Sequence, residues 1–410
     1  MRILVLSNLY PPYYLGGYEL ACAEVVEALR QRGHEITVLT SWHGLKFPRA
    51  KSHILRLLRC VWLDGRSLDD GWRNPLVEVG WSLWNRSVLS LLIRNVRPAV
   101  LHVFNPGGLG GLFLDLVHSQ SVPVVHDVFD PWLPVAYTWD PWFRFCRTGS
   151  TSVLKNALGS VAVTLASPFL RTVPTPVDLT RSYFRSEYLR QYIGGAGLNI
   201  GNAPVIYHGL RLTDLQASDD ANRTGDIAFA GRLRPEKGVH VLLQALLLLK
   251  RSRSTERLKV TIMGSVADLD YWHQLQELAI QLLPQVCVDF TGQLARSDMN
   301  RLLRKHSVFA FPVVWDEPFG IVLLEALAAG AAVVTTATGG AAEILTDREN
   351  CLVVPREDPV ALAGALDCVL CDVGLRRRLS ARGLESVKRY NFDQSIDLIE
   401  GHLHSVASRS

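Results

Sequence analysis

The sequence predicts an α/β protein of two domains, each with a parallel β-sheet covered by helices. Short β-rich runs alternate with amphipathic helical runs almost from end to end of the 410 residues, and this alternation is typical of parallel sheets with helices on both faces. The length matches two to three ordinary domains. Hydrophobic residues make up 48% and charged residues 20%, a composition that excludes disorder and allows large cores.

Two series of predicted strands support the two domains. In the first half, residues 3–7 and 35–40 flank an amphipathic helix at 18–32 that Gly33 ends. The remaining strand candidates of this half are residues 100–104, 122–128, 161–165 and 205–207. The second series comprises residues 226–230, 259–263, 286–290, 308–313, 332–335 and 351–354.

Residues 194–222 separate the two series and are rich in Gly, Asn and Asp. We therefore place the boundary there, with a first domain at 1–205 and a second at 206–390. Two such domains create a cleft where ligands bind, and ligands of open α/β sheets lie at the carboxyl ends of the strands. Residues that directly follow strands are consequently the first candidates for a site.

Charge and cysteine content restrict the partners and the compartment. The net charge of +4 does not by itself indicate nucleic acid, and no nucleic-acid partner is expected. The N-terminal apolar run is too short for a signal peptide, and no window approaches the roughly 18 apolar residues of a membrane-spanning helix. Seven scattered cysteines then favour reduced thiols in the cytoplasm. We interpret Cys368 and Cys371, a lone C-x-x-C, as core packing.

The most informative segment is 315–330, WDEPFGIVLLEALAAG. A strand runs into a turn that holds Glu317, Pro318 suits the first helical turn, and Gly330 ends the helix. Glu325 follows Glu317 by about two helical turns, so both project from nearly the same side. Two such carboxylates suit hydrogen bonds to the hydroxyls of a sugar and a ribose. The alternative is a helix-terminal acid and one exposed Glu.

A second segment, 229–239, reads FAGRLRPEKGV. A strand ends at Gly231, and Arg232 and Lys237 flank a loop that opens a helix. Backbone donors and the dipole at a helix start favour an anion, and these two cations suit a diphosphate. The alternative is a solvated basic turn in which Arg234 pairs with the neighbouring Glu.

Three weaker signals follow other strands. Gly16 and Gly17 lie between a strand and a helix, where glycines let backbone approach a ligand; the alternative is an ordinary tight turn. This loop is not the G-x-G-x-x-G fingerprint, which disfavours a nicotinamide site. His126 follows the run 122–125 and would face the cleft and bind substrate, unless it is merely structural. Residues 339–343 form a further turn at the rim of the second sheet.

Together these segments resemble the retaining glycosyltransferases of family 4. The motifs that carry the resemblance are Gly16-Gly17-x-Glu19, Gly231-Arg232 with Lys237-Gly238, and the run from Glu317 to Glu325, E-P-F-G-I-V-L-L-E. The resemblance implies the GT-B fold, in which two Rossmann-like domains face an interdomain cleft and the second domain binds most of the donor. It also implies that a terminal helix at 391–407 packs back on the first domain.

The resemblance further implies roles for single residues. Arg232 and Lys237 would hold the donor diphosphate, Glu317 the transferred sugar and Glu325 the ribose. The remaining donor contacts would come from Gly16, Gly17, Gly231, Phe319, Gly320, Ile321 and Val322, and a sugar contact from His126. The Ala341-Ala342 pair departs from the bulkier residue or Pro of many members, which puts the contact of residues 339–343 in doubt.

The expected function is retaining transfer of a sugar from a nucleoside-diphosphate sugar to a hydroxyl of a glycan, a glycolipid or a small molecule. The acceptor would attack from the face that the leaving phosphate vacates, and neither a metal nor another cofactor is expected. An epimerase or hydrolase of nucleotide sugars and a non-catalytic nucleotide-sugar-binding protein remain the alternatives. We expect a cytoplasmic protein.

A basic, aromatic segment at 46–62 leaves a membrane contact open. No acid occurs from residue 36 to 63, whereas Trp42, Trp62 and several Lys and Arg do. As a helix with one basic face, this segment would contact anionic lipids at the inner face of the membrane. The alternative, which we favour, is a strand or packed helix of the first domain at 53–58.

Overall fold

The computed structural model describes residues 1–43, 45–60, 75–148, 161, 163–164, 171–211, 225–252 and 257–409. The chain divides into two compact units. The first unit comprises Met1–Ile206 and Ile396–Ser410, and the second comprises Tyr207–Ser395. The division predicted from the sequence, at 205/206 with a terminal helix at 391–407, falls within a few residues of these bounds.

The first unit is built on a seven-stranded sheet in the order β3-β4-β2-β1-β5-β6-β7. Its strands are β1 (Arg2–Leu6), β2 (Glu35–Ser41), β3 (Arg49–Lys51), β4 (Ile54–Leu58), β5 (Val100–Val103), β6 (Val124–Val128) and β7 (Tyr183–Phe184). All neighbouring strands are parallel except β3 and β4. β5 is buried along its whole length and β1 beyond its first residue, which is why both are almost entirely apolar in sequence, with His102 the exception in β5.

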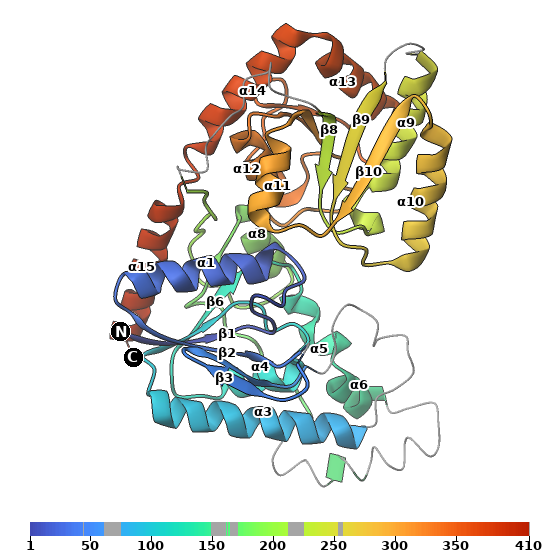
Figure 1. Cartoon of the computed structure of the whole chain (residues 1–410). Helices are drawn as coiled ribbons and strands as arrows, with labels where there is room; N and C mark the ends of the chain where they lie inside the picture. Colours follow the sequence, from blue (N-terminus) through green and yellow to red (C-terminus); the bar gives the residue numbers. More distant parts are fainter. Residues whose placement is uncertain are drawn as a thin grey trace. The chain divides into compact units, whose positions relative to one another are not determined.

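Helices cover both faces of this sheet. They are α1 (Gly17–Gln31), α3 (Pro75–Val96), α4 (Gly111–His118), α5 (Ala136–Trp139), α6 (Pro141–Thr148), α8 (Glu187–Gly195) and the terminal α15 (Phe392–Ser408). Figure 1 shows α1 over one face of the sheet and α3 and α4 over the other. From Ile396 onward α15 belongs to the first unit, and its Ile399 and Leu403 are fully buried.

The second unit has a parallel six-stranded sheet in the order β10-β9-β8-β11-β12-β13. Its strands are β8 (Gly225–Ala230), β9 (Leu258–Met263), β10 (Val286–Gly292), β11 (His306–Phe311), β12 (Ala332–Thr335) and β13 (Cys351–Val353). Its helices are α9 (Val239–Ser252), α10 (Leu269–Leu282), α11 (Arg296–Leu303), α12 (Ile321–Ala328), α13 (Pro359–Cys371) and α14 (Val373–Val387). α9 and α10 lie over one face of the sheet, and α11 and α12 over the other (Figure 1).

The fold class predicted from the sequence is confirmed. Each of the six strands predicted for the second half is present, and four of the first half are present as β1, β2, β5 and β6. Residues 205–207 form no strand, and only a single bridge joins Val205 to Phe184. The predicted strand at 161–165 lies mostly outside the described residues, and its described members are helical.

The basic segment at 46–62 contains the edge strand β3 and its neighbour β4. The interpretation of residues 53–58 as a strand is confirmed, and the amphipathic-helix interpretation is wrong for these residues. β4 pairs with β2, and this pairing buries Leu58 fully and Arg56 to 8% exposure. The Arg56 guanidinium donates to the Pro11 carbonyl at 2.6 Å, so it does not lie on a solvated basic face. Trp62 is outside the described residues.

The structure also bears on the predictions for the cysteines and for membrane-spanning helices. All seven cysteines are free, and Cys368 and Cys371 are exposed on α13, so their interpretation as core residues is wrong. The apolar positions that α13 buries are Leu362, Leu366 and Val369, which lie on the opposite face of the helix. Every helix in the described part of the chain is too short or too polar to cross a membrane.

Candidate active site

An ion pair between Lys237 and Glu317 is the centre of the candidate site in the second unit. Lys237 ends a short 3₁₀ helix (Pro235–Lys237) that follows β8, and Glu317 lies in the loop between β11 and α12. Their Nζ and Oε2 atoms are 2.6 Å apart, with side chains 13% and 11% exposed. Partial burial strengthens the attraction and fixes both groups at the carboxyl edge of the sheet.

Trp315 joins this pair and was not among the residues predicted from the sequence. Its indole N–H donates to the same Glu317 Oε2 at 3.1 Å. The Lys237 ammonium lies 4.8 Å from the centre of the Trp315 ring, within cation–π distance. The sequence did hold a signal for it, since a Trp beside two acids shortly after a buried strand supplies a ring and a donor at the sheet edge where ligands bind.

Glycines bring the backbones of this site together. Gly238 has φ +71°, and a Cβ there would lie 1.8 Å from the Pro312 carbonyl oxygen. The adjacent Val314 amide donates to the Glu236 carbonyl at 3.0 Å, which ties the Lys237 loop to the end of β11. Only glycine allows this approach.

A second glycine loop supports Glu317 from the other side. Gly339 starts a 3₁₀ helix, Gly339–Glu343, with φ +59°, and a Cβ there would lie 2.6 Å from the Glu317 carbonyl oxygen. The Gly340 amide donates to that oxygen at 2.7 Å. In this structure residues 339–343 therefore position the backbone of Glu317.

α12 begins later than the sequence suggested. Gly320 precedes the helix with φ +88°, and the first helical residue is Ile321, so Pro318 lies before the first turn and the prediction for it is wrong. Since Glu317 also lies outside the helix, helical periodicity does not relate it to Glu325. The Phe319 side chain is fully buried and stacks on Tyr207 with ring centres 6.0 Å apart, which leaves its backbone as the group that could meet a ligand.

Glu325 points into a buried ion pair. Its side chain is 5% exposed, and its Oε1 accepts from Arg296 Nε of α11 at 2.5 Å. The alternative of an exposed surface Glu is therefore wrong. Burial of a carboxylate demands a partner, and Arg296, which the sequence analysis did not single out, supplies it.

Arg232 follows β8 directly and is half-buried. Its backbone carbonyl accepts from the Arg234 amide at 3.0 Å, whereas within the described residues its side chain forms no hydrogen bond or ion pair, so the guanidinium stays available for an anion. Arg234 Nε lies 2.9 Å from Glu236 Oε1, as the alternative for this segment expected. The segment thus combines a solvated pair with the partly buried Lys237. The Gly231 amide donates to the Met263 carbonyl at 2.9 Å.

In the first unit, Gly16 and Gly17 start α1. Gly16 is the N-cap in an extended conformation, and a Cβ there would meet nothing within 4 Å. The buried Glu19 accepts from the Gly16 amide at 3.0 Å and from Asn105 Nδ2 at 3.0 Å. Burial raises the pKa of Glu19, and these hydrogen bonds oppose the rise. Glu19 therefore caps the helix, and the start of α1 beside Gly16 is open.

His126 does not occupy the position predicted for it. β6 continues to Val128, so His126 lies in the middle of the strand and is 1% exposed. Its Nε2 lies 3.0 Å from Nε2 of His118, and the two rings stack. Burial, followed by the nearby His118 and His102, lowers the pKa of His126 well below its ordinary value. The residues that actually follow the strand are Phe129 and Asp130.

Asp127 points to the other face of β6, as alternation along a strand requires. It forms a fully buried ion pair with Arg185, and Tyr183 Oη donates to its Oδ2 at 2.8 Å. His126 and Asp127 consequently cannot act together on a substrate, and both stabilise the interior of the first unit.

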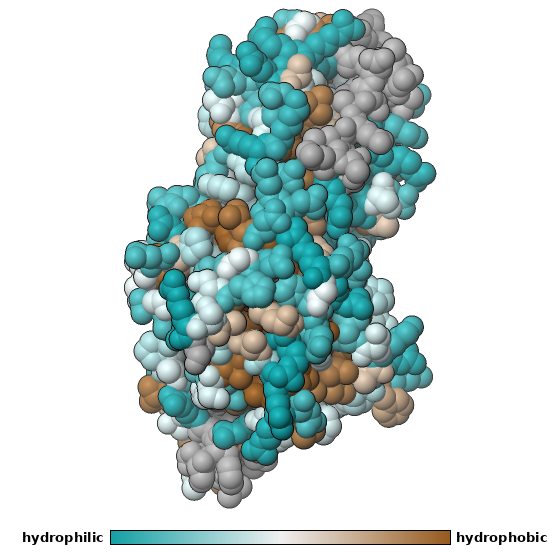
Figure 2. Space-filling model, turned by 90° about the vertical axis from the view of Figure 1, so that its left-hand side faces the viewer, coloured by the Kyte–Doolittle hydropathy of each residue, from teal (hydrophilic) through white to brown (hydrophobic). Residues whose placement is uncertain are grey.

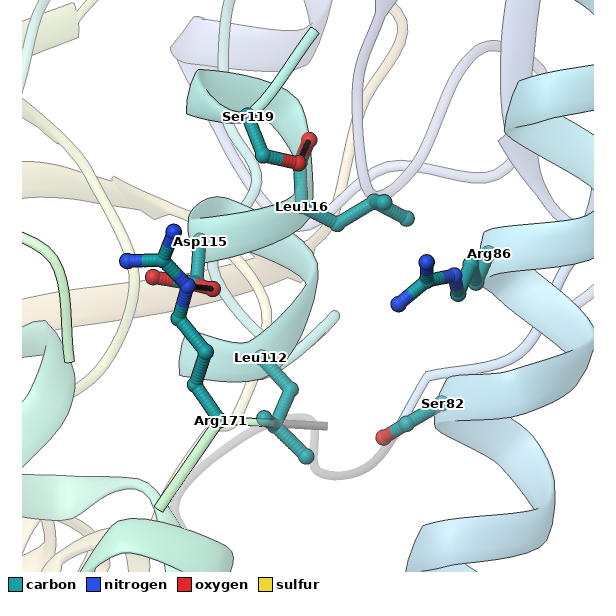
Figure 3. Close-up of a pocket in the computed structure, with 7 residues that line it drawn as sticks. All are labelled: Ser82, Arg86, Leu112, Asp115, Leu116, Ser119 and Arg171. Carbon is teal, nitrogen blue, oxygen red and sulfur yellow. Dashed lines mark hydrogen bonds and ion pairs between the residues drawn. The ribbon is translucent and has the colours of Figure 1, made fainter. Parts of the chain in front are cut away.

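A separate pocket of about 190 Å³ lies in the first unit. Its lining comprises Ser82, Arg86, Leu112, Asp115, Leu116, Ser119 and Arg171, and Figure 3 shows Arg86 reaching from α3 toward α4. Asp115 accepts from the Thr175 amide at 3.0 Å and lies 3.6 Å from Arg171. Asp115 is thus already engaged by the Thr175 amide and by Arg171, and the pocket contains none of the predicted site residues.

Two family models match the chain, each over one half. The model described as "Glycosyltransferase Family 4" matches residues 15–181, and "Glycosyl transferases group 1" matches residues 213–386. The second match contains the whole candidate site of the second unit. The chain therefore belongs to glycosyltransferase family 4 and is a glycosyltransferase of the GT-B fold.

Relatives and solved structures agree with this assignment. A phosphatidyl-myo-inositol mannosyltransferase of Mycolicibacterium smegmatis is 26% identical over 383 residues, which cover 92% of this chain and 87% of that protein. Sucrose-phosphate synthase from Thermosynechococcus elongatus superposes with a TM-score of 0.74 at 17% identity, over 100% of both chains. Anabaena HepE, solved in complex with UDP and glucose, has a TM-score of 0.70 at 18% identity, over 98% of this chain and 99% of that one.

Proposed function

We propose that this protein is a retaining glycosyltransferase that uses a nucleoside-diphosphate sugar and transfers the sugar to a hydroxyl acceptor. The observation that carries the proposal is the presence of two partly buried ion pairs on one unit, Lys237 with Glu317 and Arg296 with Glu325. Each pair holds a carboxylate at the position where the family resemblance places a sugar or a ribose contact. The half-buried Arg232 adds a second cation beside Lys237.

Donor binding would exchange the partners of the Lys237–Glu317 pair. The diphosphate oxygens would take the ammonium of Lys237, and sugar hydroxyls would take the carboxylate of Glu317. The Trp315 N–H would remain on Glu317 and keep its orientation. Both ions thus keep a partner before and after binding, which avoids the cost of an unpaired buried charge.

The chemical step requires stabilisation of the leaving group more than a strong base. The bond between the anomeric carbon and the phosphate oxygen breaks, and the acceptor oxygen bonds to the same carbon from the same face. The leaving phosphate takes the proton of the acceptor hydroxyl. Arg232 and Lys237 supply positive charge where the phosphate charge develops, so we propose that the reaction needs no metal ion.

The test starts with a panel of nucleotide sugars in a thermal-shift assay, because a ligand of the native state raises its melting temperature. UDP-glucose comes first, since HepE was solved with UDP-glucose. Product analysis by NMR with EDTA present would then follow the anomeric configuration. A product that retains the anomeric configuration of the donor supports the proposal. Epimerised or hydrolysed donor without sugar transfer supports instead an epimerase or hydrolase of nucleotide sugars. If no nucleotide sugar raised the melting temperature, the proposal would be refuted.

The substitution Trp315→Phe distinguishes the contribution of the indole N–H from that of the aromatic ring. The ring contact with Lys237 is kept, but Glu317 loses a hydrogen bond of 3.1 Å. We expect kcat to fall about 3- to 30-fold, while the Kd of the nucleoside diphosphate alone stays the same because it has no sugar for Glu317 to bind. Steady-state kinetics and calorimetry measure the two quantities. Equal losses in both would indicate general damage to the loop.

A lipid-linked acceptor is favoured by one group of side chains in the first unit. The Arg59 guanidinium lies 3.8 Å from the centre of the Trp42 ring, and the 45% exposed Trp84 lies 6.3 Å from Trp42 between ring centres. Phe47, five residues after Trp42 in the chain, is 77% exposed. Exposed aromatic rings beside cations suit the interface of an anionic membrane. The relative from M. smegmatis is named for a phosphatidyl-inositol substrate.

Liposome flotation tests this membrane contact. Vesicles with about one third anionic phospholipid should float the protein at low salt and release most of it at high salt, because salt screens the attraction. Phe47→Ser should weaken flotation, and Leu269→Ser, an exposed apolar residue of the second unit, serves as the matched control. No flotation at either salt concentration would leave a soluble acceptor.

A further inference from the structure

A group of metal-ligating side chains in the first unit belongs to none of the sites described above. It comprises His34, in the turn between α1 and β2, and Glu400 and His404 on α15. One ligand atom of each residue lies within 4.8 Å of those of the other two. Figure 1 shows the end of α15 beside the N-terminus of the chain, and the face on which this helix lies, drawn in Figure 2, is largely hydrophilic.

The fold fixes the direction of each of these side chains. Glu400 and His404 are four residues apart and therefore share one face of α15. The fully buried Ile399 and Leu403 hold the adjacent face of the helix against the unit. Gly33, with φ +88°, turns the chain after α1 and directs His34, which is 8% exposed, toward Glu400.

The distances suit a cation between the three groups. His34 Nε2 lies 2.7 Å from Glu400 Oε1, and the His34 and His404 ring centres are 5.6 Å apart. Zinc binds His nitrogen and Glu oxygen at about 2.0–2.2 Å, which separates tetrahedral ligand atoms by about 3.3–3.5 Å. If the contact between His34 and Glu400 lengthened slightly and His404 moved slightly closer, all three side chains could bind one zinc ion.

The residues that contact the candidate ligands include a hydrogen-bond donor that would orient Glu400. Glu400 Oε2 accepts from Arg32 Nη1 at 2.6 Å, and Arg32 also lies 2.7 Å from Asp397. Such hydrogen bonds orient a ligating carboxylate. The Glu400 and Asp397 carboxylates are balanced by Arg32 and the Met1 ammonium, so it is the ligand types and their spacing that favour a metal. His34 Nδ1 lies 3.3 Å from the Met1 ammonium, which donates to it, so metal binding at Nε2 would move the ring proton to Nδ1 and open this contact.

We propose that His34, Glu400 and His404 form a binding site for a divalent transition metal, with Zn²⁺ the best match to two imidazoles and one carboxylate. Water fills the fourth position. The metal fastens α15 to the turn between α1 and β2 and takes no part in sugar transfer. The site is thus structural, and its presence does not depend on the proposed reaction.

The experiment is a titration of the untagged, chelator-treated full chain with ZnSO₄ at pH 8, followed by isothermal calorimetry and thermal shift. We expect one Zn²⁺ per chain and a higher melting temperature, because the metal binds the folded state. His404→Ala removes an exposed ligand and should weaken binding at least 10-fold. His273→Ala, an exposed histidine of α10, is the matched control and should bind like the wild type.

Two further readings make the result decisive. Co²⁺ in place of Zn²⁺ should give visible absorption typical of four-coordinate geometry, and hydrogen exchange should slow in α15 with Zn²⁺ in the wild type but not in His404→Ala. His34 is buried, so the His404 variant, whose fold is checked without metal, carries the test. Absence of a stoichiometric site in the wild type, or unchanged binding by His404→Ala, would overturn the proposal.

Discussion

Lys237→Ala should lower turnover by about 10²- to 10³-fold while the protein remains folded. The substitution removes the cation that the proposed mechanism places on the leaving diphosphate. A 100-fold loss corresponds to about 2.7 kcal/mol of transition-state stabilisation. It also leaves Glu317 with Trp315 as its neighbouring donor, so its carboxylate still has one hydrogen bond of 3.1 Å. Steady-state kinetics with the identified donor measures the loss, and circular dichroism checks the fold.

Arg234→Ala is the matched control for this prediction. Arg234 lies on the same loop but forms a solvated pair with Glu236 at 2.9 Å, and exposed pairs contribute little. We expect its kcat to stay within about threefold of the wild type. Near-normal turnover of Lys237→Ala, or equal losses in the two variants, would contradict the role of Lys237 in charge stabilisation.

Gly238→Ala should be the most destabilising single substitution near the site. The position has φ +71°, and the new Cβ would lie 1.8 Å from the Pro312 carbonyl oxygen. The left-handed conformation costs about 1–2 kcal/mol, and the displaced backbone adds a similar amount. We expect a loss of about 3 kcal/mol, or about 6–12 °C in the melting temperature of a unit of this size. Differential scanning calorimetry measures the shift.

Gly364→Ala provides the comparison, because it makes the same chemical change in a permissive place. Gly364 is exposed within α13, and a Cβ there would meet nothing within 4 Å. Alanine favours a helix over glycine by about 0.5–1 kcal/mol, so this variant should melt at the same or a slightly higher temperature. If Gly238→Ala behaved like Gly364→Ala, the close approach of the two loops would not be required for folding.

Much of the candidate site could be predicted because its residues belong to two short segments, each of which follows a strand. Glu317 and Glu325 belong to one strand–loop–helix segment, and Arg232 and Lys237 to another, so their place after a strand follows from sequence patterns. Trp315 was missed although its partner Glu317 is only two residues away, whereas its contact with Lys237 and the pairing of Arg296 with Glu325 join separate segments. Arg296 precedes its partner Glu325 by 29 residues, and no periodicity relates them.

His126 shows where a sequence boundary misleads. The apolar run ends at Val125, yet β6 continues through His126 and Asp127 to Val128. Each of these two polar side chains finds a buried partner on its own face of the strand, His118 on one and Arg185 on the other. Because a buried polar group is tolerated once it is paired, a strand can continue past the point where hydrophobicity stops.

The sequence by itself determined the alternation of strands and helices, since strands buried on both faces are mostly apolar and helices repeat their apolar positions about every turn. Only the tertiary structure decided which charged groups become partners. His34 and Glu400 are 366 residues apart, and Lys237 and Glu317 are 80 apart. Such contacts depend on the assembly of the complete sheets and on the packing of α15 against the first unit. An ion pair forms only where the packed backbone brings its two groups within a few ångströms.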